Sequence, residues 1–478
     1  MDSKQNQIPL YQAITDFKDN QNVSLHVPGH KNGEIFVSKA KEQFQAFLQM
    51  DLTELDGLDD LHAPEGVIQE AQEIAADWFR SNYTYFLVNG STVGNLAMIL
   101  ATCDSGDQVL VQRNCHKSIL HGMELAGVQP IFLPPAYNKI NQRYTAPSVA
   151  TVKKAIAEYK EAKALILTYP DYFGDIYPIQ EIIDLAHSYN ITVLVDEAHG
   201  CHFSLPSLLV PSTVELGADV VVQSAHKMTP ALTMAAYLHV QSSRVERERI
   251  SYYLQMLQSS SPSYPIMASL DLARYYLATF TPEQSKDLFA YIEKIRACFN
   301  DSDHWVLEQS DDPLKVCLRV KEGVNSQDVK QLFEEEKLYP ELITDKHILF
   351  ILGLEPTIDP NILIDKIRRI TDRLIFCSKR ATIEEKNHYF NEDITPLALS
   401  YADMRHQKQK WCIWKEAAGK IAAEAIIPYP PGIPLLAKGE EISETIIKKI
   451  QDLLDQKISF QPKNRRNGLY IYDVTEGE

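Results

Sequence analysis

The segments ITVLVDEAHG (191–200) and DVVVQSAHK (219–227) decide the fold, because each is a short β-branched run that ends in polar residues. Outward from them, similar runs alternate with helical stretches from about Tyr85 to Val240. This alternation predicts right-handed crossover units and a mostly parallel sheet. The runs 219–227 and 232–240 are joined by a link too short for a crossover helix, so we expect this pair to be antiparallel. The expected fold class is therefore α/β.

The remaining elements follow from hydrophobic periodicity. The α/β block is expected to hold strands at 85–89, 107–112, 130–134, 163–169, 191–198, 219–227 and 232–240, and helices at 92–101, 117–126, 148–161 and 179–189. The chain then reads as helical from about 244 to 280. A smaller α+β block follows, with strands at 313–320 and 347–354 and a helix at 361–374. A connection is expected at 378–403, then a strand-like run at 420–436, a helix at 443–457 and a strand at 469–474. We predict four parts: an N-terminal segment 1–60, a large domain 61–280, a small α+β domain 281–377 and a C-terminal α+β domain 378–478.

Composition excludes several classes of protein. Of 478 residues, 45% are hydrophobic and 23% charged, which is typical of a globular chain and not of a disordered or fibrous one. The 47 basic and 64 acidic residues give a net charge of −17, which argues against a nucleic-acid or membrane-surface partner. No apolar run reaches the ~18 residues of a bilayer helix, and the N-terminus lacks the pattern of a secretory signal. The seven cysteines are scattered without a CxxC pair, so we expect a cytoplasmic protein without disulfides or a zinc site.

Two interpretations of the histidine-rich motifs lack the further motifs that they need. DEAH (196–199) matches a helicase box, but the chain has no GxxxxGK[ST] loop to cradle phosphates. A metal site could use His199 with His202, or His26 with His30. A strong metal site would need HExxH or a carboxylate at fixed spacing, and neither is present. We therefore expect no metal.

A third interpretation is a site for pyridoxal phosphate, which needs a lysine, a carboxylate for the pyridine nitrogen, a phosphate-binding helix start and an aromatic ring. Candidates occur in the expected order along the chain: Gly90, Ser91 and Thr92 at a helix start, His116 after a strand, Asp196 at the end of a buried strand, and Lys227 after another. Each has an ordinary explanation alone, as a helix cap, a salt-bridge partner or a surface lysine. The ordered set points to the cofactor.

The same stretches resemble the prokaryotic ornithine/lysine/arginine decarboxylase family. The matching motifs are HVPGHK (26–31), LDDLHAPEG (58–66), RNCHKS (113–118), VDEAHG (195–200), SAHK (224–227), SYPIMASLD (263–271) and IIPYPPGIPL (426–435). This family uses pyridoxal phosphate on an aspartate-aminotransferase-like, fold type I architecture. The resemblance thus implies a mostly parallel seven-stranded sheet in a large cofactor-binding domain. It is closest to the short members, which lack a wing domain.

The resemblance also implies roles for individual residues. Lys227 would form the Schiff base, Asp196 would pair with the pyridine nitrogen, and His199 or Lys227 would return a proton to the substrate. Residues implied to line the cofactor are His116, Ala198 and His199 at the ring, and Gly90, Ser91, Thr92, Ser224 and His226 at the phosphate. The segment 259–264 would reach the partner's site in a homodimer or a larger even oligomer. The N-terminal segment 1–60 would pack on the dimer and on the active site.

The chain departs from the family pattern where the substrate would be recognised. Pro230 and Met234 replace glycine-rich residues after the lysine, Asp171 stands where relatives carry a threonine, and KGE (438–440) replaces PGE. A basic substrate needs a carboxylate for its cationic end. We predict Asp171, Glu424 and Glu440 as candidates.

The expected reaction is α-decarboxylation of a basic amino acid, and no residue separates arginine, lysine and ornithine. Arginine is favoured because the short family members look most like arginine decarboxylases. The alternatives are an aminotransferase or lyase on the same fold, or a cofactor-binding protein that has lost decarboxylase activity.

Overall fold

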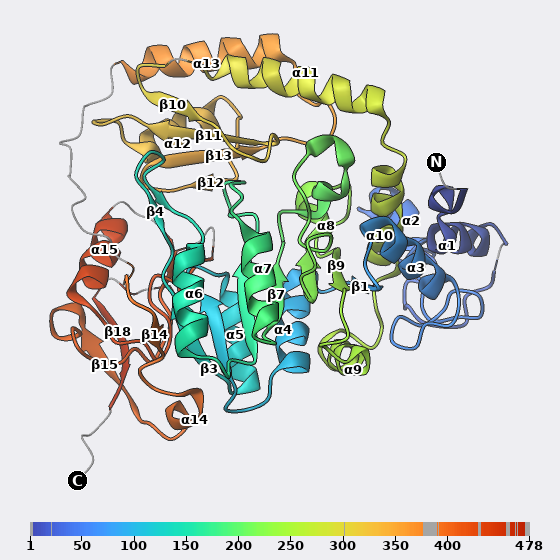
Figure 1. Cartoon of the computed structure of the whole chain (residues 1–478). Helices are drawn as coiled ribbons and strands as arrows, with labels where there is room; N and C mark the ends of the chain where they lie inside the picture. Colours follow the sequence, from blue (N-terminus) through green and yellow to red (C-terminus); the bar gives the residue numbers. More distant parts are fainter. Residues whose placement is uncertain are drawn as a thin grey trace. The chain divides into compact units, whose positions relative to one another are not determined.

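The computed structural model describes residues 3–20, 22–300, 302–375, 390, 392–428, 432–455, 459–463, 465 and 467–473 (Figure 1). The chain divides into two compact units. The first unit comprises Met1–Thr102 and Thr192–Pro282, and the second comprises Cys103–Ile191 and Glu283–Glu478. None of the helices described is both long and apolar enough to cross a bilayer.

The first unit holds one half of the α/β block. Its strands are β1 (Tyr83–Leu87), β7 (Thr192–Asp196), β8 (Val220–Gln223) and β9 (Ala236–Val240). Its helices are α1 (Pro9–Asp19), α2 (Lys41–Leu48), α3 (Val67–Phe79), α4 (Gly90–Thr102), α8 (Ala225–Met228), α9 (Arg247–Leu257) and α10 (Tyr264–Ala278). The strand order is β1-β9-β8-β7, with β7 parallel to β8 and β9 antiparallel to both β8 and β1. The antiparallel pairing predicted for the last two strands is confirmed.

The second unit holds the other half and the C-terminal parts. Its main strands run β6 (Ala164–Thr168), β2 (Gln108–Gln112), β3 (Gln129–Leu133) and β14 (Thr395–Pro396). The first three are parallel, and β14 adds a short antiparallel edge. The helices α5 (Lys117–Ala126), α6 (Val149–Glu158) and α7 (Ile179–Ser188) belong to these strands. The two units together hold all seven strands expected from the sequence, so the mostly parallel α/β prediction is confirmed.

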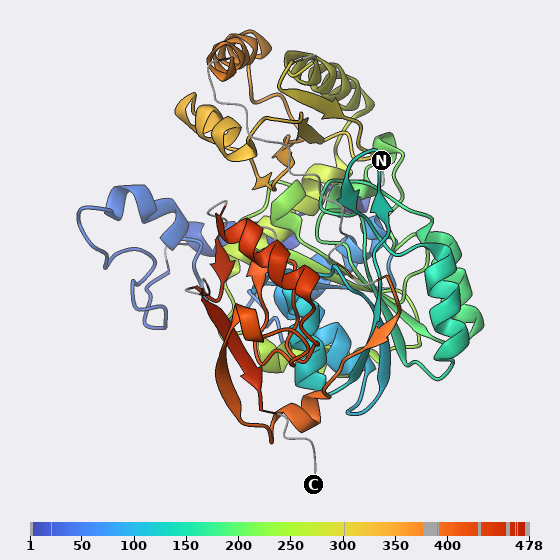
Figure 2. The same cartoon turned by 90° about the vertical axis from the view of Figure 1, so that its left-hand side faces the viewer.

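A four-stranded antiparallel sheet forms the small α+β block in the second unit. Its order is β10 (Trp305–Glu308), β11 (Lys315–Val320), β13 (His347–Ile351) and β12 (Leu342–Ile343). It is accompanied by α11 (Pro282–Cys298), α12 (Ser326–Glu335) and α13 (Pro360–Leu374), and Figures 1 and 2 show α11 and α13 side by side. The hairpin β4 (Tyr137–Asn138) and β5 (Arg143–Tyr144) lies earlier in the chain.

The C-terminal part packs α15 (Glu444–Asp455) on its own apolar core with β15 (Gln409–Ile413) and β18 (Gly468–Tyr472). The short α14 (Tyr401–Met404) and the pair β16 (Ile427–Pro428) and β17 (Phe460–Gln461) complete it. In the described part of the run 420–436, the expected strand is wrong except for β16. Pro428, the last residue of β16, has no backbone N–H to donate to a ladder. Residues 429–431 of this run, and part of the connection expected at 378–403, lie outside the described residues.

Candidate active site

Asp196 lies at the end of β7 with its carboxylate held by two donors in the first unit. Asn95 Nδ2 donates to Oδ2 at 2.9 Å, and the Ala198 backbone N–H donates to Oδ1 at 3.2 Å. Burial raises the pKa of Asp196, against the charge of Lys227 and these two hydrogen bonds, which lower it. The side chain is 3% exposed, so a carboxylate in this position has few ways to satisfy its charge without a cationic partner.

Lys227 lies on the single-turn helix α8, directly after β8. Its Nζ lies 3.2 Å from His199 Nε2, and its backbone N–H donates to the Ser224 carbonyl. A lysine ammonium has no acceptor, so it donates to Nε2 and the proton of a neutral His199 ring lies on Nδ1. In the first unit, the amine of Lys227 therefore lies next to the imidazole of His199. The charge of Lys227 also lowers the pKa of the Asp196 carboxylate.

The start of α4 carries the predicted phosphate-site residues in the same unit. Gly90 has φ +74°, its N–H donates to the Met234 carbonyl at 2.8 Å, and no atom lies within 4 Å of a Cβ built on it. Ser91 Oγ lies 2.5 Å from Ser224 Oγ, and Thr92 is exposed. A helix start favours an anion through its first N–H groups and its dipole. The hydroxyl groups of Ser91 and Ser224 meet at this helix start and can add donors for a phosphate.

The His226 ring is held by the backbone carbonyl of Ala235. Its Nδ1 lies 3.0 Å from the Ala235 carbonyl, which fixes the proton of the neutral ring on Nδ1. Burial lowers the pKa of His226; the hydrogen bond to Ala235 opposes this, and the charge of Lys227 adds to it. Met234, in the same turn, has φ +80°. This explains why glycine would be favoured at a position where this chain carries methionine.

His116 belongs to the second unit, where it caps α5. Its Nδ1 accepts from the Ser118 backbone N–H at 3.2 Å and lies 2.8 Å from Ser118 Oγ. The ring is half-buried. The Gly432 carbonyl accepts from the backbone N–H of Lys117, the residue after His116, at 3.1 Å.

The predicted recognition residue Asp171 lies in the turn between β6 and α7 of the second unit. Its Oδ1 accepts from the backbone N–H groups of Phe173 and Asp175, both at 2.9 Å. Burial raises its pKa to about 7; the negative charge of Asp175 adds to the rise, and Arg143 opposes it. Asp171 therefore shapes a turn, as aspartate commonly does.

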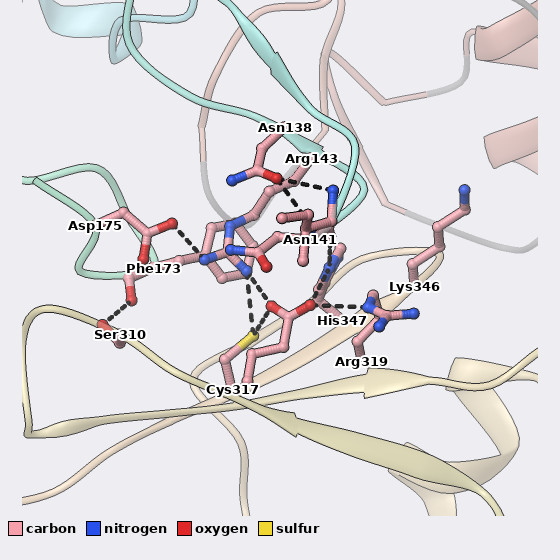
Figure 3. Close-up of polar contacts among 12 residues, drawn as sticks. Asn138, Asn141, Arg143, Phe173, Asp175, Ser310, Cys317, Arg319, Lys346 and His347 are labelled. Atoms are coloured by element: carbon pink, nitrogen blue, oxygen red, sulfur yellow. Dashed lines mark hydrogen bonds and ion pairs between the residues drawn. The ribbon is translucent and has the colours of Figure 1, made fainter. Parts of the chain in front are cut away.

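A buried ion-pair cluster follows this turn (Figure 3). The guanidinium of Arg143 pairs with Asp175 at 2.6 Å and with Glu308, and it stacks 4.4 Å from the centroid of the Phe173 ring. Glu308 also accepts from Arg319 Nε at 2.9 Å. The cluster ties the turn to the small antiparallel sheet.

The other two predicted recognition residues are also paired within the second unit. Glu440 accepts two hydrogen bonds from Arg113, from Nε and Nη2, both at 2.6 Å. Glu424 accepts from Nε and Nη2 of Arg465 at 2.8 and 2.7 Å. Such bidentate pairs are among the strong ones in proteins. Each carboxylate would have to exchange a protein partner for a substrate.

Sequence reasoning did not identify Asn95. It lies four residues after Ser91 on α4, so both side chains project from one face of the helix. A polar residue at i+4 from a phosphate-site serine was the available signal. Asn95 is 1% exposed, which fits a residue that orients Asp196.

Comparison with known proteins gives a consistent result. The family model for "Orn/Lys/Arg decarboxylase, major domain" matches residues 8–310, and the model for the C-terminal domain of the same family matches residues 382–462. YaaO of Bacillus subtilis is 42% identical over 477 residues, which cover 97% of this chain and 98% of that protein. The arginine decarboxylase of B. subtilis is 33% identical over 475 residues, 96% of each chain.

Solved structures agree on the fold. The lysine decarboxylase LdcF of Francisella novicida superposes with a TM-score of 0.80 at 19% identity, over 98% of this chain and 81% of that chain. A structure of SPT with PLP superposes with a TM-score of 0.55 at 15% identity, over 77% of this chain and 85% of that chain. At these identities the likeness concerns the fold alone.

Proposed function

The chain belongs to the Orn/Lys/Arg decarboxylase family, and from this premise we propose that it removes the α-carboxyl group of a basic amino acid with pyridoxal phosphate. The products would be CO₂ and the corresponding amine. The observation that carries the proposal is the convergence of Lys227 Nζ, the Asp196 carboxylate and the Ser91–Ser224 hydroxyl pair within the first unit. These are the groups that this cofactor needs, so the residues present fit it.

When bound, the cofactor supplies an electron sink for the carbanion left by the departing CO₂. Asp196 would hold a proton on the pyridine nitrogen, because its buried carboxylate gains most from a cationic partner. Asn95 and the Ala198 N–H keep the carboxylate in one orientation. This fixed geometry lowers the entropic part of the barrier.

Lys227 would attach the cofactor through Nζ. His199 Nε2, 3.2 Å away, can accept a proton from Nζ and return it. Either group can then deliver a proton to the α-carbon of the substrate. Gly90, Ser91, Thr92, Ser224 and His226 would hold or flank the phosphate, with Ala198, His199 and His116 at the ring.

Arginine is our first choice of substrate, lysine the second and ornithine the third. The support is the 33% identical relative named arginine decarboxylase, which matches this chain almost end to end. Asp171, Glu424 and Glu440 are proposed as recognition residues. The competing explanation is a structural role, because Glu424 and Glu440 are paired with arginines and Asp171 accepts from backbone N–H groups.

We also propose a homodimer, or a larger even oligomer, in the cytoplasm. The segment 23–47 exposes eight large apolar side chains: Val23, Leu25, Val27, Ile35, Phe36, Val37, Phe44 and Phe47. An exposed apolar patch of this kind commonly marks a protein interface. Part of the segment 259–264 is held by His62, whose Nε2 lies 2.8 Å from the Ser259 carbonyl. The scattered cysteines support a reducing compartment.

The test of the proposal is Lys227→Ala, with the exposed Lys154→Ala as control. Wild type and the control should bind pyridoxal phosphate with a visible absorption band, and borohydride should fix the label on the peptide that contains Lys227. The Lys227→Ala protein should lose both. A variant that keeps the band and the label at normal intensity would refute the assignment.

A further inference from the structure

Glu197, the residue after Asp196, is fully buried and receives four hydrogen bonds within the first unit. Ser212 Oγ and Gln223 Nε2 donate to Oε1 at 2.8 and 2.9 Å. The Thr213 backbone N–H donates to Oε2 at 2.7 Å, and its hydroxyl donates to the same oxygen. Burial raises the pKa of Glu197 to about 7, and the four donors oppose this rise. Four donors around one carboxyl group match the acceptor capacity of a carboxylate.

The side chain folds back over Gly200, which explains the glycine of DEAHG. A Cβ at Gly200 would lie 2.5 Å from Glu197 Cγ and 2.6 Å from Oε1. Real Cβ atoms do not approach other atoms so closely, so any larger residue would displace the glutamate. The motif thus encodes a specific placement of the Glu197 carboxyl group.

This placement joins the ends of two strands where cofactor-binding residues leave them. Glu197 N–H donates to the Val222 carbonyl at 2.9 Å, and its side chain accepts from Gln223. Asp196 precedes Glu197, and Ser224 follows Gln223 and opens the turn that carries Lys227. The hydrogen bonds from Ser212 and Thr213 also tie the segment between β7 and β8 to the Glu197 carboxylate.

The link extends across the sheet of the first unit through Gln223 and His239. Because Gln223 Nε2 donates to Glu197, its Oε1 must accept from His239 Nε2, which lies 3.1 Å away. His239 Nδ1 is then the acceptor for Thr84 Oγ1 at 2.8 Å. Burial lowers the pKa of His239 to about 3, so the ring is neutral and its one proton lies on Nε2. One directed chain of bonds connects β1, β9 and β8 to Glu197.

We propose that Glu197 is a positioning residue that holds Asp196 and the Ser224–Lys227 turn at the separation required by the cofactor. Its carboxyl group accepts from Ser212, Thr213 and Gln223, which are all protein groups, so it acts through these neighbours. The consequence for the cofactor rests on the proposed function. The bond network itself does not.

The test is Glu197→Gln, with Glu248→Gln on the exposed face of α9 as matched control. The amide keeps the size of the side chain but turns one acceptor into a donor, which would face the Thr213 N–H or the Gln223 amide. We expect the dissociation constant for pyridoxal phosphate to rise at least about tenfold. At saturating cofactor, the visible circular dichroism of the bound cofactor should fall, because its orientation is less restricted. The control should match wild type in both.

Ser212→Ala is measured in parallel, because it removes one donor and keeps the carboxylate. A smaller loss of cofactor affinity, about two- to fivefold, is expected. Dissociation constants within twofold of wild type and unchanged dichroism in both variants would overturn the proposal. A loss of stability with unchanged dichroism at saturating cofactor would also overturn it, because that result describes a residue needed for folding alone.

A separate measurement distinguishes failure of the proposed function from failure of the Glu197 network. If wild type binds no pyridoxal phosphate, the proposed function fails, and the Glu197 network is tested on the cofactor-free protein. There, hydrogen exchange at the Thr213 amide should be at least about tenfold faster in Glu197→Gln than in wild type. Equal exchange rates would overturn the network.

Discussion

Asp196 is the residue on which the proposed chemistry depends most directly. Its carboxylate is buried and oriented by Asn95 and Ala198. Replacement by asparagine keeps the shape of the side chain but removes the charge that would keep the pyridine nitrogen protonated. We expect Asp196→Asn to retain cofactor and to lose at least about a hundredfold in kcat, or about 2.7 kcal/mol of barrier. Steady-state kinetics on the loaded variant measure this, with the exposed Asp184→Asn as control. Near-normal turnover would remove Asp196 from the role.

Asp171 gives a prediction about pH. Its pKa is about 7 in the folded protein and near 3.8 in an unfolded chain, so the folded state binds more protons between these values. Its contribution to stability is therefore fully present below about pH 4 and is lost as the pH rises through 7. Asp171→Asn removes this loss. The variant should gain on the order of 1–3 kcal/mol in unfolding free energy relative to wild type between pH 4.5 and 8.

Urea unfolding at the two pH values measures the effect, with Asp184→Asn as control. A pH-independent difference would mean that Asp171 is ionised in the folded state. The same variant tests substrate recognition. If it shifts relative turnover among arginine, lysine and ornithine, Asp171 contacts the substrate despite its bonds in the turn.

The sequence predicts a site residue only where its position after a strand, and its spacing from other site residues, can be recognised. Lys227, Asp196 and Ser91 stand out because they follow strands at recognisable spacing. Asn95 did not stand out, because its i+4 spacing from Ser91 marks only a shared helix face and its partner Asp196 lies 101 positions away. Glu197 did not stand out, because its partners lie 15 to 26 positions away. The ion pairs of Glu424 and Glu440 join residues 41 and 327 positions apart, so no local pattern could reveal them.

At the scale of elements, α4 depends on a close approach to the strands beneath it. A Cβ at Gly94 would lie 2.8 Å from both Leu87 Cδ1 and Val222 Cγ1. Gly94→Ala should therefore lower the free energy of unfolding by about 1–3 kcal/mol, because overpacking outweighs the better helix propensity of alanine. Gly29→Ala is the control, since no atom lies within 4 Å of its built Cβ. Chemical denaturation compares the two, and equal stability of both variants would contradict the packing.

Periodicity predicts the elements well where local signals agree. The helix expected at 117–126 coincides with α5, because a polar cap precedes it and Gly127 with φ +70° ends it. In the described part of the run 420–436, Ile426 and Leu436 fill the C-terminal core and share only an isolated bridge, so the expected strand is wrong there except for β16. The helix α11 was not expected, because its amphipathic pattern is weak. Its Arg296 donates to the Glu308 and Lys315 carbonyls of the small sheet.

At the scale of the whole molecule, the exposed apolar segment 23–47 is the feature that needs a partner. Leu25 is 90% exposed in the chain alone. If a second copy covers it, Leu25→Glu should weaken the dimer at least about tenfold, because burial of a leucine is worth roughly 1.5–3 kcal/mol. Ile140→Glu is the control, as an equally exposed apolar residue outside the segment. Sedimentation velocity at micromolar concentration gives the result. A fully active wild-type monomer would contradict both the dimer and the shared site.

The central claim is α-decarboxylation of a basic amino acid. The most direct test incubates the purified holoenzyme with arginine, lysine or ornithine labelled at the α-carboxyl carbon and follows products by mass spectrometry. We predict labelled CO₂ and unlabelled amine in equal amounts, fastest with arginine, and no product with Lys227→Ala. A keto acid without amine, or no turnover of any of the three by a protein that binds pyridoxal phosphate, would contradict the claim.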